Sequence, residues 1–151
     1  MSEVETDESF MREALLEAKR AAENNEVPVG AVVVSDKKIL SRAHNSTISL
    51  YDPTAHAEIL AIREACRIKK NYRIPGCDLY VTLEPCVMCL GAVFQARIRR
   101  LIFGAYDPKT GAVESMMAFP FDRMNHTVEI EAGILSEECG KILKDFFVER
   151  R

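Results

Sequence analysis

The chain has 151 residues, of which 48% are hydrophobic and 28% are charged, as in one globular domain and unlike disordered or collagen-like proteins. Its formal net charge of −3 argues against nonspecific coating of nucleic acid, because such binding neutralises many phosphates. No apolar run approaches the roughly 18 residues of a membrane span, and residues 1–10 lack the basic and then apolar layout of a secretory signal. We therefore expect a cytoplasmic protein without membrane contact.

The first half of the chain predicts a helix, the two strands of a hairpin and a second helix, in that order: 9–24, 29–35, 39–44 and 52–70. Asp7 or Ser9 is expected to cap the first helix. The first strand is almost wholly apolar, as a strand buried on both faces should be. An Asp-Pro-Thr sequence predicts the start of the second helix, since these residues are typical of helix N-termini.

The second half alternates strands and helices, with a last strand that is weaker: 78–83, 85–96, 100–104, 128–131 and 136–150. No element is assigned to 105–125. In the last helix, Ile142, Leu143, Phe146 and Phe147 are expected to face inward. The succession predicts a three-layer α/β/α architecture with a central mixed sheet of about five strands. In such sheets the chemistry gathers where strands end and helices begin.

Three residues at those junctions have the spacing of metal ligands, and a fourth lies beside them. His56 lies in the first turn of one predicted helix. Cys86 and Cys89 lie at the start of the next, three positions apart and so on one helix face. One nitrogen and two sulfur ligands favour zinc. Three protein ligands leave a fourth tetrahedral position for water, whose pKa zinc lowers to about 7. Glu58 follows His56 by two residues and can face that water as a proton carrier.

Each part of this pattern has a common alternative explanation. A lone CxxC is often a redox pair or half of a structural zinc site, and a helical glutamate is usually solvated. The five cysteines are an odd number in a chain without an export signal, which disfavours a disulfide framework. The combination of H-x-E with P-C-x-x-C is much more specific than either half.

This combination is the signature of zinc-dependent nucleobase deaminases. Further segments resemble the tRNA-specific adenosine deaminases of the cytidine and deoxycytidylate deaminase superfamily: 26–31, 52–58, 80–89, 103–105, 109–112, 124–126 and 145–147. The resemblance extends from the first predicted helix to the last. It implies a cytidine deaminase-like fold and a single zinc-dependent deaminase domain over 1–151.

The resemblance also implies an activity, namely hydrolysis of the wobble adenosine of an arginine tRNA to inosine by a homodimer. His56, Cys86 and Cys89 would hold one zinc ion per chain, and Glu58 would shuttle protons. Hydroxide would add at carbon 6 of adenine, ring nitrogen 1 would be protonated, and ammonia would depart.

Contacts with the tRNA anticodon stem-loop are implied at four positions. Asn45 would hydrogen-bond the purine edge, Asp107 would approach the anticodon backbone, and Phe147 and Arg150 would lie on an RNA-facing last helix. The residues alone leave other roles open: a turn residue for Asn45, core packing for Phe147 and a solvated tail for Arg150.

Two other functions remain open. A deaminase of free cytosine, guanine or a nucleoside would share the metal site. A structural zinc module would need a fourth protein ligand, for which the candidates are His44, Cys66 and Cys77. Two basic clusters can either contact phosphates or complement the C-termini of helices: Lys69, Lys70 and Arg73, and Arg97, Arg99 and Arg100.

Overall fold

The structure, a computed structural model, describes residues 3–150, so positions 1, 2 and 151 of the predicted domain lie outside it. Its elements follow one another as α1 (Glu3–Glu23), β1 (Gly30–Ser35), β2 (Lys38–His44), α2 (Ala57–Lys69), β3 (Asp78–Leu83), α3 (Val87–Gln95), β4 (Arg100–Ala105), the 3-10 helix η1 (Phe121–Arg123), β5 (Glu129–Ala132) and α4 (Ser136–Glu149). None of these helices combines the length and the apolar character that crossing a bilayer demands.

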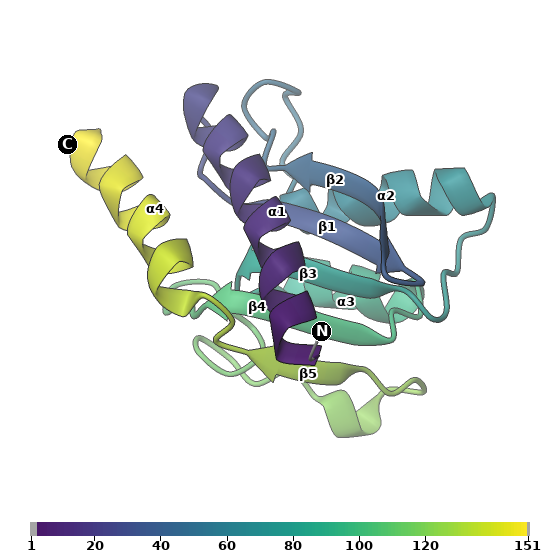
Figure 1. Cartoon of the computed structure of the whole chain (residues 1–151). Coiled ribbons are helices and arrows are strands. Elements are labelled where there is room, and N and C mark those ends of the chain that lie inside the picture. Colours follow the sequence, from purple (N-terminus) through teal and green to yellow (C-terminus); the bar gives the residue numbers. More distant parts are fainter. Residues whose placement is uncertain (1–2, 151) are drawn as a thin grey trace.

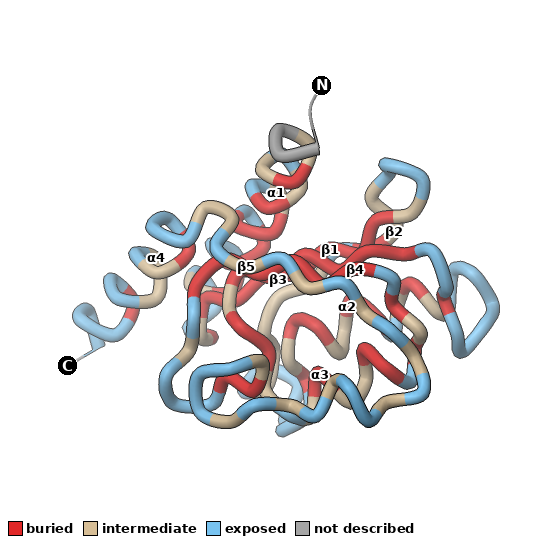
Figure 2. The backbone as a smooth tube through the Cα atoms, turned by 90° about the horizontal axis from the view of Figure 1, so that it is seen from below, coloured by how far each residue is buried: buried red, intermediate tan, exposed pale blue. Residues whose placement is uncertain are grey.

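The strands form one mixed sheet in the order β2-β1-β3-β4-β5. Strand β1 is antiparallel to β2 and β3, whereas β3, β4 and β5 are parallel to one another. Helices α1 and α4 cover one face of this sheet, and α2 and α3 cover the other (Figures 1 and 2). The predicted three-layer α/β/α architecture with a mixed five-stranded sheet is therefore confirmed.

Strand β1 shows why both faces of the sheet are apolar. Ala31 and Val33 point into the core beneath α2 and α3, and Val32 and Val34 point into the core beneath α1, because successive side chains of a strand alternate between faces. Helix α1 crosses this strand so closely that a Cβ on Gly30 would lie 1.9 Å from the carbonyl oxygen of Ala14. Only glycine fits there.

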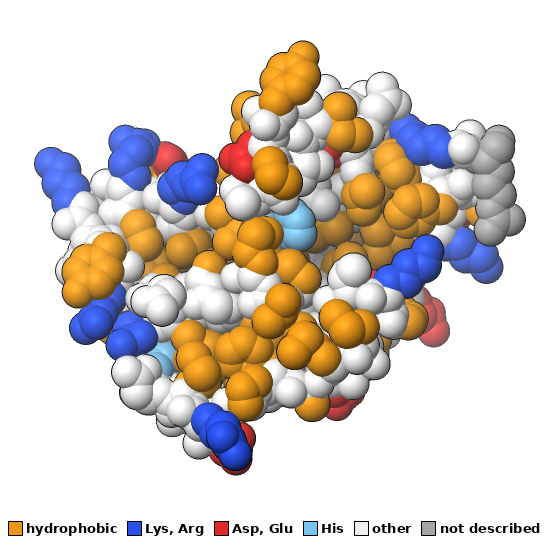
Figure 3. Space-filling model, turned by 180° about the vertical axis from the view of Figure 1, so that it is seen from behind, with side chains coloured by type: hydrophobic (Ala, Val, Ile, Leu, Met, Phe, Trp, Pro, Cys, Tyr) orange, Lys and Arg blue, Asp and Glu red, His pale blue; other side chains and the backbone are white. Residues whose placement is uncertain are grey.

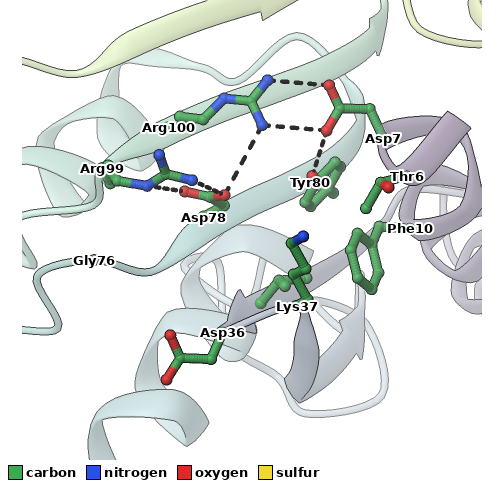
Figure 4. Close-up of a pocket in the computed structure, with 11 residues that line it drawn as sticks. Thr6, Asp7, Phe10, Asp36, Lys37, Gly76, Asp78, Tyr80, Arg99 and Arg100 are labelled. Carbon is green, nitrogen blue, oxygen red and sulfur yellow. Dashed lines mark hydrogen bonds and ion pairs between the residues drawn. The ribbon is translucent and has the colours of Figure 1, made fainter. Parts of the chain in front are cut away.

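Helix α1 begins earlier than predicted, and the capping roles expected for Asp7 and Ser9 are wrong. Both residues lie inside the helix, and the Asp7 carboxylate turns inward to the sheet. It accepts hydrogen bonds from both terminal guanidinium nitrogens of Arg100, at 3.2 and 3.0 Å, and from the Tyr80 hydroxyl at 2.6 Å (Figure 4). A buried ion pair of this kind costs about 3–5 kcal/mol when one partner is removed, since the other charge is left uncompensated.

The same edge of the sheet carries a cavity of about 660 Å³, lined by residues of α1, the β1–β2 turn and the starts of β3 and β4 (Figure 4). Here Arg99 donates two hydrogen bonds to Asp78, at 2.9 and 2.6 Å. Arg99 and Arg100, which belong to the second basic cluster, are thus held in ion pairs within the protein. The cavity lies where β3 and β4 begin. The predicted metal site lies at the opposite end of the sheet, where these strands end.

Helix α2 begins at Ala57, five residues later than predicted. The Asp52 carboxylate accepts hydrogen bonds from the N–H and the hydroxyl of Thr54, at 2.8 and 2.7 Å, so this segment is a turn of its own before the helix.

The expected inward orientation of Phe147 is wrong. Its side chain is 51% exposed, whereas Phe146 is buried. Consecutive residues of a helix point about 100° apart, so α4 can bury only one of the two rings against the rest of the protein. Core packing is thereby excluded for Phe147.

Candidate metal centre

Two helix N-termini meet at the predicted metal site. His56 is the N-cap of α2 and Cys86 is the N-cap of α3, both with extended backbone. Each offers its carbonyl oxygen to the first turn of its helix, with Leu60 and Leu90 donating at 3.0 Å. Cys89 follows in the first turn of α3 and is fully buried. Helix N-termini carry positive partial charge, which stabilises thiolates at this site.

The distances within the group fit one zinc ion. His56 Nδ1 lies 3.7 Å from Cys86 Sγ and 3.5 Å from Cys89 Sγ, and the three ligand atoms lie within 4.8 Å of one another. Tetrahedral coordination with ordinary Zn–N and Zn–S lengths separates nitrogen and sulfur by about 3.6 Å. His56, Cys86 and Cys89 are thus positioned to bind one metal ion, as their spacing predicted.

The pKa values of the two thiols are shifted in opposite directions. A hydrogen bond from Cys89 lowers the pKa of Cys86 to about 4, against the effect of burial. The pKa of Cys89 is raised, because its thiol donates that hydrogen bond and is buried. The pKa of His56 is raised by its hydrogen bond with Cys86. The hydrogen bond from Cys89 thus favours the thiolate form of Cys86, which is the form of cysteine that binds a metal.

Glu58 is a buried carboxylate beside these ligands. It lies in the first turn of α2 and is 4% exposed. Its side chain hydrogen-bonds with that of Cys89, and burial raises its pKa to about 7. A carboxyl group with such a pKa can both accept and release a proton near neutral pH.

The positions expected to contact RNA are divided between two parts of the fold. Asn45 lies next to the metal centre, where its Oδ1 accepts a hydrogen bond from the Ala57 N–H at 2.8 Å. Asp107 lies in the loop after β4 and accepts hydrogen bonds from the N–H and hydroxyl of Thr110, at 3.3 and 2.7 Å. Phe147 lies on α4, across the sheet from α2 and α3.

Arg150, just beyond α4, is not an unattached tail. Its guanidinium lies 3.6 Å from the centroid of the Phe146 ring and donates a hydrogen bond to Asn25 Oδ1 at 2.9 Å. Arg150 thereby ties the end of α4 to the turn that follows α1.

The candidates for a fourth protein ligand lie elsewhere. His44 Nδ1 is 3.0 Å from Glu17 Oε1, the Cys66 thiol donates to the Tyr72 carbonyl, and Cys77 is buried in the core. Among the described residues, the group able to hold a metal consists of His56, Cys86 and Cys89. The structural zinc module therefore lacks its fourth ligand within that part of the chain.

Two buried carboxylates that were not predicted from the sequence anchor loops near the site. Glu26 accepts hydrogen bonds from the N–H groups of Ile48 and Ser49, at 3.2 and 2.8 Å, in the loop before His56. Glu84 accepts hydrogen bonds from the loop after β4. The available signal was weak, because an acidic residue beside an apolar run usually marks a solvated strand end.

Comparison with known proteins agrees with this site. Residues 4–105 match the family model of the cytidine and deoxycytidylate deaminase zinc-binding region. A tRNA-specific adenosine deaminase of Haemophilus influenzae is 50% identical, covering 97% of this chain and 86% of the relative. One of Bacillus subtilis is 48% identical, covering 96% and 91%.

A solved structure from work on A-to-I editing by tRNA:A34 deaminases at the wobble position of transfer RNA superposes with a TM-score of 0.83. It is 49% identical and covers 89% of this chain and 99% of its own. The chain therefore belongs to the zinc-binding cytidine and deoxycytidylate deaminase family, in the branch of the tRNA-specific adenosine deaminases.

Proposed function

We propose that this enzyme converts adenosine to inosine at the wobble position of a tRNA anticodon, with an arginine tRNA as the substrate. The observation that carries the proposal is that His56, Cys86 and Cys89 form one metal-binding group beside the buried Glu58. The chain is also about half identical to relatives named tRNA-specific adenosine deaminases. The reaction consumes one water and releases one ammonia.

In the proposed mechanism, His56, Cys86 and Cys89 hold zinc. When bound there, zinc would lower the pKa of a water molecule to about 7, which would make hydroxide available at neutral pH. Glu58 takes the proton of this water and delivers it to ring nitrogen 1 as carbon 6 of adenine is attacked. Glu58 would then take the proton of the new hydroxyl on carbon 6 and give it to the exocyclic amine, so that the amine leaves as ammonia and carbon 6 becomes the carbonyl of inosine. Its pKa of about 7 suits both directions of transfer.

RNA recognition is proposed to use a base that is splayed out of the anticodon loop, since a stacked base cannot reach a buried metal centre. Asn45 would hold the purine edge, Asp107 would approach the anticodon backbone, and Phe147 and Arg150 would contact the RNA from α4. The position of Asn45 beside the first turn of α2 supports its role, and the exposure of Phe147 supports a surface role.

The proposal includes a homodimer that acts in the cytoplasm. Hydrophobic side chains gather on the face that carries α2 and α3, with lysines and arginines towards its edges (Figure 3). Exposed apolar residues occur on α3 and in the loop before α2, namely Val87, Leu50 and Tyr51, the last 95% exposed. Exposed apolar side chains that gather on one face favour burial against a partner.

The direct test is incubation of the purified protein with the anticodon stem-loop of an arginine tRNA, followed by sequencing for inosine. Inosine is expected at the wobble position, and a stem-loop with guanosine there should be unchanged. Turnover of free guanine or cytosine, without inosine in the stem-loop, would instead establish a free-base deaminase.

A further inference from the structure

Glu84 sits between the sheet and the metal centre. It follows β3 directly, two residues before Cys86, and its side chain is 2% exposed. Its carboxylate accepts hydrogen bonds from four backbone N–H groups and one hydroxyl of a single loop: the N–H groups of Asp107, Val113, Glu114 and Ser115, at 3.0, 3.0, 2.9 and 3.1 Å, and the Ser115 hydroxyl. These donors compensate the cost of burying a charge.

The loop 107–115 has no helix or strand of its own. Its backbone is instead fixed by a few contacts, of which those to Glu84 are the most numerous. A further hydrogen bond, from the Ala112 N–H to the Pro85 carbonyl at 2.8 Å, ties the loop to the residue next to Cys86. The loop is thus fastened to the segment that carries a metal ligand.

The glycine at position 111 is independent evidence that the loop wraps tightly around this carboxylate. A Cβ on Gly111 would lie 2.4 Å from the carboxylate carbon of Glu84 and 2.6 Å from the carbonyl oxygen of Asp107. Any side chain at this position would push the loop away from Glu84. Meanwhile Lys109 and Thr110, at the outer side of the loop, are exposed.

We infer that Glu84 is a positioning residue for RNA binding: its carboxylate holds the loop 107–115 in the shape that presents Asp107 and its neighbours to the substrate beside the metal centre. This inference rests on the proposed function. Glu84 itself is buried beneath the loop and acts only through the loop that it holds.

The test is Glu84→Gln, which preserves the side-chain volume but replaces one acceptor oxygen by an NH₂ group facing N–H donors. The Asp107 amide uses one carboxylate oxygen and the amides of 113–115 use the other. Hydrogen exchange should therefore accelerate by about tenfold or more at whichever of these two sets faces the NH₂ group, because that set loses its acceptor. KM for the anticodon stem-loop should rise by about tenfold, with kcat changed by less than about threefold, as expected when binding contacts are lost. Zinc content should stay at one ion per chain.

The matched control is Asp78→Asn, which changes a buried carboxylate at the other end of β3, where its partners are Arg99 and Arg100. It should lower thermal stability without changing KM or the exchange of the loop amides. Gly111→Ala should reproduce the raised KM with Glu84 intact, which keeps the test valid if Glu84→Gln folds poorly.

The inference is overturned if the loop amides and KM of Glu84→Gln match the wild type, or if Asp78→Asn raises KM equally. A wild-type protein that edits no stem-loop would overturn the proposed function and the substrate role assigned here. The exchange measurement would then still report separately whether Glu84 holds the loop.

Discussion

Replacing Glu58 with glutamine is expected to lower kcat for adenosine deamination by about 10²–10⁴-fold, the contribution of a well-placed proton carrier. Glutamine has nearly the same volume and can fill the same buried site, but it cannot take a proton from water. Glu58→Ala should show a loss at least as large. Zinc content and thermal stability should be retained in both variants, because the carboxylate is not among the three metal ligands.

The matched control is Glu64→Gln on the same helix. Glu64 lies near the surface and pairs with Arg67, and exposed pairs of this kind contribute about 0–1 kcal/mol. Its kcat should equal that of the wild type. If zinc were lost together with activity in Glu58→Gln, the assignment of Glu58 as a proton carrier would be wrong.

Serine in place of Cys86 or Cys89 is expected to abolish both zinc binding and activity. A serine hydroxyl stays protonated at neutral pH and is a poor ligand for a metal that prefers thiolates. Zinc per chain should fall to less than about a tenth of the wild-type value, since only two of the three ligands remain. Metal analysis of dialysed protein, beside the inosine assay, measures both effects.

Cys66→Ser provides the control for this pair. Cys66 is partly buried and donates its S–H to the Tyr72 carbonyl, away from the metal centre. It should retain one zinc ion and full activity. Loss of zinc from Cys66→Ser, or its retention in Cys86→Ser, would show that the ligand set is different.

The regular part of the fold could be predicted because it depends on local patterns. The apolar run that forms β1 and the spacing of His56, Cys86 and Cys89 are both visible without knowledge of distant contacts. The three-layer order followed from the alternation of strands and helices. The metal-binding group could be predicted because the two helices that carry its residues begin at the same end of the sheet, where the strands before them end.

The errors arose where long-range contacts decide the outcome. Asp7 has the character of a helix cap, but its partner Arg100 lies 93 positions away and draws the carboxylate into the protein. Phe147 is the last of the four apolar residues of the final helix that were expected to face inward, but its side chain lies at the surface. The loop after β4 escaped prediction because its shape depends on Glu84 rather than on any repeating pattern of its own residues.

The proposed mechanism depends most directly on the metal and the atoms that coordinate it. X-ray absorption spectroscopy at the zinc edge of the purified wild-type protein measures both. We predict one zinc ion per chain with one nitrogen ligand, two sulfur ligands and one oxygen ligand from water. A third sulfur or a second nitrogen from the protein in place of that oxygen, or full activity in a chain free of metal, would contradict it.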